Sequence, residues 1–237
     1  MPSKKKLLTR EEIKARFEAE NPQTYSKYHP IFAPEYDFAF SLLLDAITPY
    51  IPQKARILDL GAGTGYLSLQ ILSRFPHVHA TLLDFSPNML SAVDDVLTDY
   101  TGHYSVVCKD FWETTLDHES FHAVVSSFAI HHARGHDEYR SLYERIYHAL
   151  KPRGVFACLD LVASVTPAWS EVMELGWRSH LETCFDAAII ERTLRNYRIE
   201  DSPLSIPAHF ACLSQAGFSI TDVLWKIHNF ALYAAQR

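Results

Sequence analysis

The sequence predicts a doubly wound α/β fold with a mostly parallel, seven-stranded sheet, and three observations support this prediction. Short apolar segments alternate with helical patterns between residues 55 and 160. These segments are predominantly apolar, which is typical of parallel strands buried on both faces. Two β-like runs within residues 218–237 predict an antiparallel hairpin at the edge of the sheet.

Length and composition predict a globular protein with a large core and disfavour nucleic-acid-binding, disulfide-rich and membrane-spanning proteins. The 237-residue chain is long enough to bury a large core, and its net charge of −6 disfavours nucleic-acid binding. Four widely spaced cysteines predict neither a disulfide framework nor a zinc site. No apolar run reaches the roughly 18 residues of a membrane span. We therefore expect a cytoplasmic protein with no nucleic-acid or membrane partner, for which a homodimer stays open.

The N-terminal segment, residues 1–50, is predicted to be helical and to cover the functional site. Thr9 and Glu12 have the spacing of a capping box and predict a helix over residues 10–20. Residues 21–37 contain three prolines and three tyrosines without periodicity, and so many aromatic side chains predict packing against the rest of the protein.

The core, residues 51–160, alternates strands and helices. We expect strands at 55–60, 78–84, 104–108, 121–130 and 155–160, and helices at 64–75, 86–97 and 137–150. This alternation requires right-handed crossovers and therefore places helices on both faces of the sheet.

The C-terminal part departs from that rhythm. Residues 161–205 lack a strand pattern and predict a helical insertion or lid between strands 5 and 6, with Val172, Leu175 and Leu181 facing inward. Residues 206–237 predict a last helix and the β-hairpin that completes the core.

Three glycines follow the first predicted strand. Gly61, Gly63 and Gly65 form G-x-G-x-G, whereas a dinucleotide turn needs G-x-G-x-x-G/A. The position that should hold a small residue is Tyr66, and no Gly-Lys-Ser/Thr follows as in a phosphate-binding P-loop. The turn therefore favours a ligand without a diphosphate.

Three carboxylates stand at the predicted strand ends. Asp59 lies in the first strand, Asp84 ends the second and Asp110 follows the third. Carboxyl ends of parallel strands meet at one edge of a sheet, so these groups would repel a phosphate-rich cofactor there. They suit a nucleoside that carries positive charge.

Five segments in order resemble the class I S-adenosylmethionine-dependent methyltransferases: "ILDLGAGTGYLS", "TLLDFSPNML", "VVCKDF", "FHAVVSSFAIHH" and "LKPRGVFACLD". The resemblance covers roughly residues 55–160 and implies a Rossmann-like fold. It implies S-adenosylmethionine as cofactor, S-adenosylhomocysteine as product, and in-line methyl transfer to a small molecule.

The resemblance also implies roles for individual residues. Asp59 would bind the ammonium group, Asp84 the ribose hydroxyls and Asp110 the adenine amine. The complete set of implied cofactor-binding residues is Tyr25, Asp59, Gly61, Ala62, Gly63, Asp84, Phe85, Met89, Asp110, Phe111 and Ser127.

Histidines are the candidate catalytic groups. His131 and His132 follow the fourth strand, where one imidazole could face the acceptor as a general base; the alternative is a structural loop. Together with His136 they form H-H-x-x-x-H, a spacing without a known ligand geometry, so no metal is expected. Candidates for the substrate pocket are Tyr28, His29, Arg178 and His228.

The wider layout is similar to a branch of small-molecule methyltransferases related to carboxy-S-adenosylmethionine synthase. Members of that branch often carry arginines after the tyrosine that Tyr25 matches, and residues 26–29 here read Ser-Lys-Tyr-His. Methyl transfer, a synthase-like use of the same cofactor, and cofactor binding without catalysis are therefore all open. The acceptor and the atom that is methylated are also open.

Overall fold

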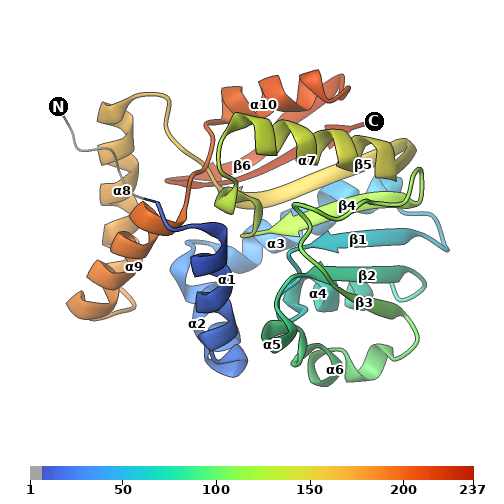
Figure 1. Ribbon diagram of the computed structural model, residues 1–237, viewed down its shortest axis with the longest axis horizontal. Coiled ribbons are helices and arrows are strands. Elements are labelled where there is room, and N and C mark those ends of the chain that lie inside the picture. The colour runs from blue at the N-terminus through green and yellow to red at the C-terminus, as the bar shows by residue number, and fades with distance from the viewer. Residues whose placement is uncertain (1–6) are drawn as a thin grey trace.

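A computed structural model describes residues 7–237 and confirms the predicted fold class. One seven-stranded sheet runs in the order β3-β2-β1-β4-β5-β7-β6 with helices on both faces (Figure 1). Strands β1 to β5 are parallel, and β7 is antiparallel to both β5 and β6. The strands are β1 (Arg56–Leu60), β2 (His79–Asp84), β3 (Tyr104–Cys108), β4 (Phe121–Ser127), β5 (Leu150–Leu161), β6 (Ile220–Ile227) and β7 (Phe230–Gln236).

Helices connect the strands and cover the sheet. The α-helices are α1 (Arg10–Ala19), α2 (Pro22–Phe32), α3 (Tyr36–Ile47), α4 (Tyr66–Arg74), α5 (Pro87–Leu90), α6 (Val93–Val96), α7 (His136–Ala149), α8 (Pro167–Glu182), α9 (Ala187–Glu200) and α10 (Ile206–Gln215). Short 3₁₀ helices are η1 (Thr48–Tyr50), η2 (Thr98–Tyr100) and η3 (Ile130–His132).

The core has two halves because successive strand residues point to opposite faces of the sheet. Ile57 of β1 packs with residues of α3 and α4, such as Phe40 and Ile71. Its neighbour Leu58 belongs to the other half, which contains residues of α7 and α10. Both β1 residues are at most 1% exposed, as the apolar strand pattern predicts.

The N-terminal segment contains the helices α1, α2 and α3. The capping box of Thr9 and Glu12 is present at the start of α1. Residues 21–37, whose sequence has no helical periodicity, contain α2. The side chain of Asn21 caps α2 by accepting from the backbone of Thr24 at 2.8 Å, and Pro22 occupies the first turn, where a helix tolerates proline.

The predicted helical insertion is present as α8 and α9, which lie beside the sheet and next to α1 and α2 (Figure 1). The inward stripe predicted for α8 is partly wrong: Val172 and Leu175 are 58% and 62% exposed. Leu181 is buried, as predicted. Trp177 also faces inward, and its indole nitrogen donates to the carbonyl of Phe32. In the part of the chain that the structure describes, no helix has the length and hydropathy of a membrane span.

Topology fixes the place of the site. The chain leaves β1 toward β2 on one side, and β4 lies on the other side of β1. A crevice is expected where the strand order reverses, at the carboxyl ends of β1 and β4. The glycine turn follows β1 and η3 follows β4, so both lie at this position.

Candidate functional site

The glycine turn has the backbone that only glycine adopts without strain. Gly61, Gly63 and Gly65 have φ values of +71°, +55° and +89°. A Cβ atom on Gly61 would overlap the Cβ of Ala129, so this position requires close backbone contact. A Cβ on Gly63 would have no atom within 4 Å, which leaves space above the turn for a ligand.

Asp84 links the turn to the end of β2. Its carboxylate accepts from the backbone N–H of Gly63 and from that of Ser86, both at 2.9 Å. Burial raises the pKa of Asp84 even though these bonds favour the ionised form. The carboxylate therefore lies at the floor of the crevice with a fixed orientation.

Asp59 lies deeper and has an unsatisfied oxygen. Its Oδ2 accepts from the hydroxyl of Ser68 at 2.7 Å, whereas Oδ1 is buried without a hydrogen-bond partner among the described residues. Burial raises the pKa of this carboxyl to about 7. A buried acceptor without a partner is costly, so Oδ1 is a candidate ligand contact.

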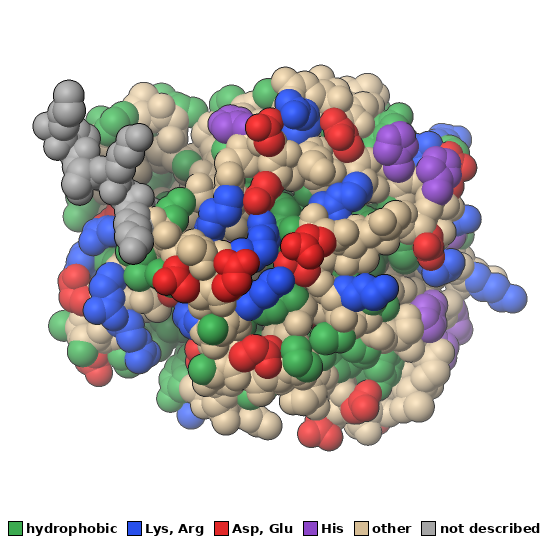
Figure 2. Space-filling view, in the orientation of Figure 1, with side chains coloured by type: hydrophobic (Ala, Val, Ile, Leu, Met, Phe, Trp, Pro, Cys, Tyr) green, Lys and Arg blue, Asp and Glu red, His purple; other side chains and the backbone are tan. Residues whose placement is uncertain are grey.

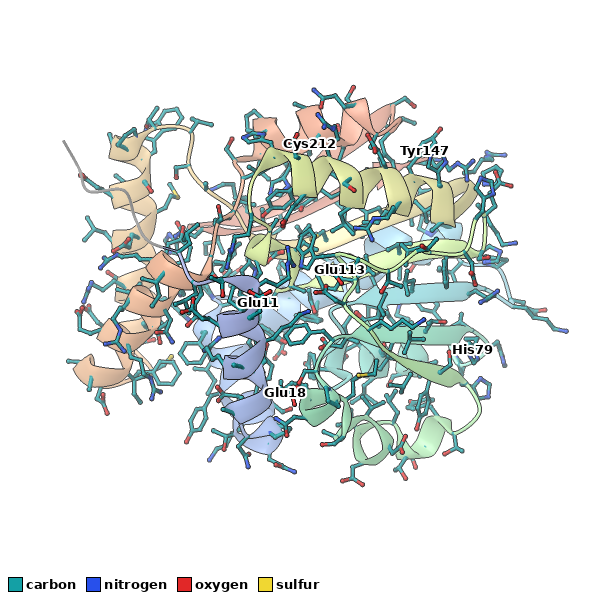
Figure 3. The ribbon with its side chains drawn as sticks, viewed as in Figure 1. Glu11, Glu18, His79, Glu113, Tyr147 and Cys212 are labelled. Atoms are coloured by element: carbon teal, nitrogen blue, oxygen red, sulfur yellow. The ribbon has the colours of Figure 1, made fainter. Side chains whose placement is uncertain are left out.

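Helix α1 covers the crevice. Lys14 Nζ lies 2.7 Å from Oδ2 of Asp110, and the side chain of Glu18 accepts from the hydroxyl of Ser86. Figure 3 shows Glu11 and Glu18 on α1, in front of the strand ends, and Figure 2 shows acidic and basic side chains alternating over this helix. The cavity that remains beneath has a volume of about 60 Å³.

Most of the implied cofactor residues line this crevice. They are Tyr25, Gly61, Gly63, Asp84, Phe85, Met89, Asp110 and Phe111. Other residues of the set lie close by: Ala62 is in the turn, Asp59 lies behind it, and Ser127 ends β4. The structure therefore brings together residues that the sequence separates by up to 86 positions.

A second, larger cavity of about 550 Å³ adjoins the crevice. The aromatic residues that line it are Phe17, Tyr25, Tyr28, His29, Phe32, Phe128, Trp177, Phe185, Tyr197 and Phe230, together with His131 and His132. The two cavities share Phe17, Tyr25, Phe128 and His132. A ligand in one cavity would therefore lie beside a ligand in the other.

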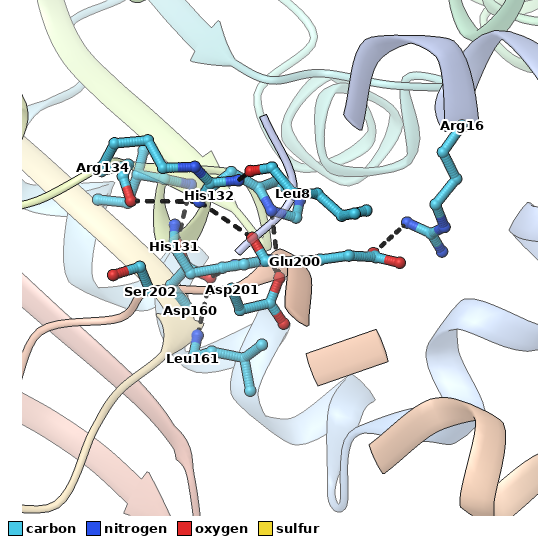
Figure 4. A network of polar contacts seen from close by, with 12 residues as sticks. Leu8, Arg16, His131, His132, Arg134, Asp160, Leu161, Glu200, Asp201 and Ser202 are labelled. Carbon is cyan, nitrogen blue, oxygen red and sulfur yellow. Dashed lines mark hydrogen bonds and ion pairs between the residues drawn. The ribbon is translucent and has the colours of Figure 1, made fainter. Parts of the chain in front are cut away.

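A buried polar network forms one end of the larger cavity (Figure 4). Asp160, at the carboxyl end of β5, accepts from the backbone of Ile130, His131 and Leu161 at 3.0, 3.1 and 2.7 Å. It also contacts Nδ1 of His131 through a short hydrogen bond. Asp160 therefore fixes the orientation of the His131 ring.

Asp201 approaches both histidines from the segment after α9. Its Oδ1 lies 3.6 Å from Nε2 of His131 and 3.1 Å from Nδ1 of His132. Burial lowers the pKa of His131, but Asp160 and Asp201 outweigh it and raise the pKa to about 9. Burial and the charge of His131 lower the pKa of His132. His131 therefore favours the protonated form and His132 the neutral form.

Two of the predicted pocket residues join the larger cavity and two do not. Tyr28 and His29 line it, and burial lowers the pKa of His29 to about 4. Arg178 lies outside it and pairs with Glu191 at 2.7 Å. His228 packs its ring so closely against Gly176 of α8 that a Cβ atom there would overlap the imidazole.

Several residues of the site are absent from the sequence-based prediction. Lys14 and Phe17 enter from α1, and Asp201 enters from the chain after α9. No local pattern marks these three residues. Asp160 has a usable signal, because it ends the fifth apolar strand on the edge of the sheet that carries Asp84 and Asp110.

Comparisons with known proteins agree with this geometry. Residues 57–154 match the model of a methyltransferase domain family. A demethylmenaquinone methyltransferase of Chlamydia muridarum is 29% identical over 110 residues, and the match spans 46% of each chain. The chain thus spans about half the length of this relative.

Two further similarities extend over more of the chain. A carboxy-S-adenosyl-L-methionine synthase of Nautilia profundicola is 21% identical over 211 residues, which is 85% of this chain and 86% of the relative. The crystal structure of human N-acetylserotonin methyltransferase in complex with SAM superposes with a TM-score of 0.61 at 17% identity, covering 96% of this chain and 56% of that one. At that identity the superposition establishes the fold alone.

Proposed function

We propose that this chain, which carries a class I S-adenosylmethionine-dependent methyltransferase domain, transfers a methyl group to a small-molecule acceptor. The domain match supports S-adenosylmethionine as the cofactor. One observation carries the acceptor part of the proposal: the glycine-turn crevice and the aromatic cavity share four lining residues. Methyl donor and acceptor would thus lie side by side.

The residues of the crevice fit a cationic nucleoside. The fixed carboxylate of Asp84 can accept hydrogen bonds from ribose hydroxyls, and the unpartnered Oδ1 of Asp59 is available to an ammonium group, directly or through water. The open space at Gly63 admits the amino-acid end. When bound, S-adenosylmethionine supplies an electrophilic methyl group on its sulfonium.

The crevice under α1 is too small for the cofactor, so α1 would have to move for the cofactor to bind. Sites for drug-sized ligands occupy roughly 300–1,000 Å³, whereas the crevice under α1 has about 60 Å³. Lys14 forms an ion pair with the carboxylate of Asp110, the group that would accept from the adenine amine. We infer that α1 swings aside when the cofactor enters, and that its polar contacts with Asp110 and Ser86 break.

The aromatic cavity would bind the acceptor. Its side chains suit an apolar or aromatic body, and its polar end would receive the group that is methylated. His132 lines both cavities and is the side chain positioned to take a proton from the acceptor. Holding the acceptor in line with the methyl group contributes on the order of 7–11 kcal/mol.

The test is turnover with a panel of aromatic acceptors that carry a hydroxyl, carboxyl, amine or thiol group. Mass spectrometry should detect S-adenosylhomocysteine together with one methylated product. Phe185→Ala, which changes the acceptor cavity alone, should raise the KM for that acceptor more than the KM for S-adenosylmethionine. Failure of every acceptor despite tight cofactor binding would contradict the proposal and favour a binding protein without catalysis.

A second candidate is a synthase-like use of the same cofactor. The similarity to carboxy-S-adenosyl-L-methionine synthase extends over 85% of this chain, which favours this candidate. Residues 26–29 oppose it, because Ser-Lys-Tyr-His stands where members of that branch often carry arginines. A modified cofactor in the mass spectrum, without a methylated acceptor, would identify this reaction.

A further inference from the structure

We propose that His131, His132 and Asp201 form a binding site for one divalent transition-metal ion at the polar end of the aromatic cavity. Each residue offers one ligand atom, and the three atoms lie within 4.8 Å of one another. The histidines belong to η3, and Asp201 directly follows α9, almost 70 positions later in the sequence. The fold thus assembles a set that the H-H-x-x-x-H spacing does not predict.

The two separations that involve Asp201 are close to those of ligands around one ion. Ligand atoms about 2.1 Å from an ion stand about 3.0 Å apart at right angles and about 3.4 Å apart in a tetrahedron. Oδ1 of Asp201 lies 3.1 Å from Nδ1 of His132 and 3.6 Å from Nε2 of His131. Both values are close to that range, so an ion could bind with small side-chain adjustments.

One contact already links two of the three ligand residues. Nδ1 of His132 pairs with Oδ1 of Asp201 at 3.1 Å, and a bound ion would replace this contact. At 3.6 Å, Nε2 of His131 is too far from Asp201 to donate to it. Nε2 of His131 therefore faces Asp201 without a hydrogen bond to it.

Asp160 prepares His131 as a ligand. It contacts Nδ1 of the ring and accepts from three backbone N–H groups, which hold the carboxylate in place. A carboxylate behind a metal-binding histidine is a common arrangement, because it fixes the tautomer and orients the other nitrogen. Here that nitrogen is Nε2, the atom on the side of Asp201 (Figure 4).

The surroundings give the ion a compensating charge and an open position. Asp160 and Asp201 are buried carboxylates, and the nearby Glu200 is already paired with Arg16 at 2.7 Å. All three ligand residues line the aromatic cavity, so further coordination positions face the acceptor. Two imidazoles with one carboxylate suit ions of the Zn²⁺, Fe²⁺ or Co²⁺ type.

The site itself stands on this geometry, while its use in catalysis rests on the proposed function. An ion there would bind the oxygen or nitrogen of the acceptor and lower the pKa of that group. His132 would then act as a ligand and no longer as the base, so the acceptor would lose its proton to solvent before methyl transfer.

The test is metal binding by the full chain without an affinity tag, after removal of metal with a chelator. Titration with Co²⁺ should give visible absorption bands that saturate at one ion per chain, and Zn²⁺ should displace it. His132→Ala and Asp201→Asn should each weaken Zn²⁺ binding by at least 100-fold. Asp160→Asn, which changes only the positioning group, should weaken it by roughly 10- to 100-fold.

His136→Ala is the matched control, because His136 is exposed at the start of α7 and lies outside the cluster. It should bind Zn²⁺ as the wild type does. Asp201→Asn should retain S-adenosylhomocysteine binding, since Asp201 does not line the crevice. No saturable Co²⁺ or Zn²⁺ binding, or binding unchanged in both ligand variants, would overturn the metal site whether or not the cofactor binds.

Discussion

Lys14 of α1 holds its ammonium group 2.7 Å from Oδ2 of Asp110, the carboxylate implied to meet the adenine amine. The same helix supplies Phe17 to both cavities. A cation of the protein therefore occupies the position of a ligand contact. Cofactor entry and the displacement of α1 would then be linked events.

Replacing Lys14 should ease cofactor entry. Its side chain is 35% exposed, and such ion pairs are worth up to about 1 kcal/mol. Lys14→Met should therefore bind S-adenosylhomocysteine up to about fivefold more tightly in isothermal titration calorimetry. Lys54→Met, at an exposed position before β1, should leave the Kd unchanged. Weaker binding by Lys14→Met would mean that Lys14 contacts the cofactor.

The two glycines of the turn should respond differently to alanine. Gly61→Ala would overlap Ala129 at a positive φ and should lower the free energy of unfolding by about 2–5 kcal/mol. Gly63→Ala meets no neighbouring atom and should cost about 1–2 kcal/mol through its φ alone.

Urea denaturation measures both effects, and cofactor titration separates them further. Gly63→Ala should remain folded and yet bind S-adenosylhomocysteine more weakly, because its methyl group enters the open space above the turn. Unchanged affinity in this variant would place the amino-acid end of the cofactor elsewhere.

Cofactor affinity should depend on pH through Asp59. Burial raises the pKa of this carboxyl to about 7, so the free protein keeps it protonated below that value. An ammonium group at Oδ1 favours the ionised form, so binding releases a proton and strengthens as the pH rises toward 7. S-adenosylhomocysteine should bind about tenfold more weakly at pH 6 than at pH 8.

Asp59→Asn should remove this dependence, because an amide does not titrate in this range. Its affinity should be low and nearly constant between pH 6 and pH 8. The same slope in the wild type and in Asp59→Asn would assign the titration to another group.

Strong periodic patterns made most of the fold predictable. Strands β1, β2, β4 and β5 are largely buried, so their apolar runs stand out, whereas the edge strand β3 is partly exposed. The C-terminal hairpin follows from its own β-like runs. No helix was predicted at the position of α2, because Pro22 and Pro30 are residues that normally interrupt a helical pattern. Pro22 lies in the first turn and Pro30 near the end of the helix, where proline is tolerated or limits only the last turn.

The candidate site was predictable only where topology places residues. Asp84 and Asp110 follow strands, so any parallel sheet brings them to one edge. Asp201 and Lys14 reach the site through packing between helices, which no local pattern encodes. Arg178 shows the converse, since its helix lies near the cavity but its side chain pairs with Glu191 outside it.

Isothermal titration of S-adenosylhomocysteine into the wild type and Asp84→Ala tests cofactor binding in the glycine-turn crevice most directly. The wild type should bind one equivalent, and Asp84→Ala should bind at least tenfold more weakly, which corresponds to about 1.5–3 kcal/mol for lost hydrogen bonds to a charged group. Asp117→Asn, at an exposed position outside the crevice, should bind as the wild type does. Equal affinity in the wild type and a folded Asp84→Ala, or no binding at all, would contradict this assignment.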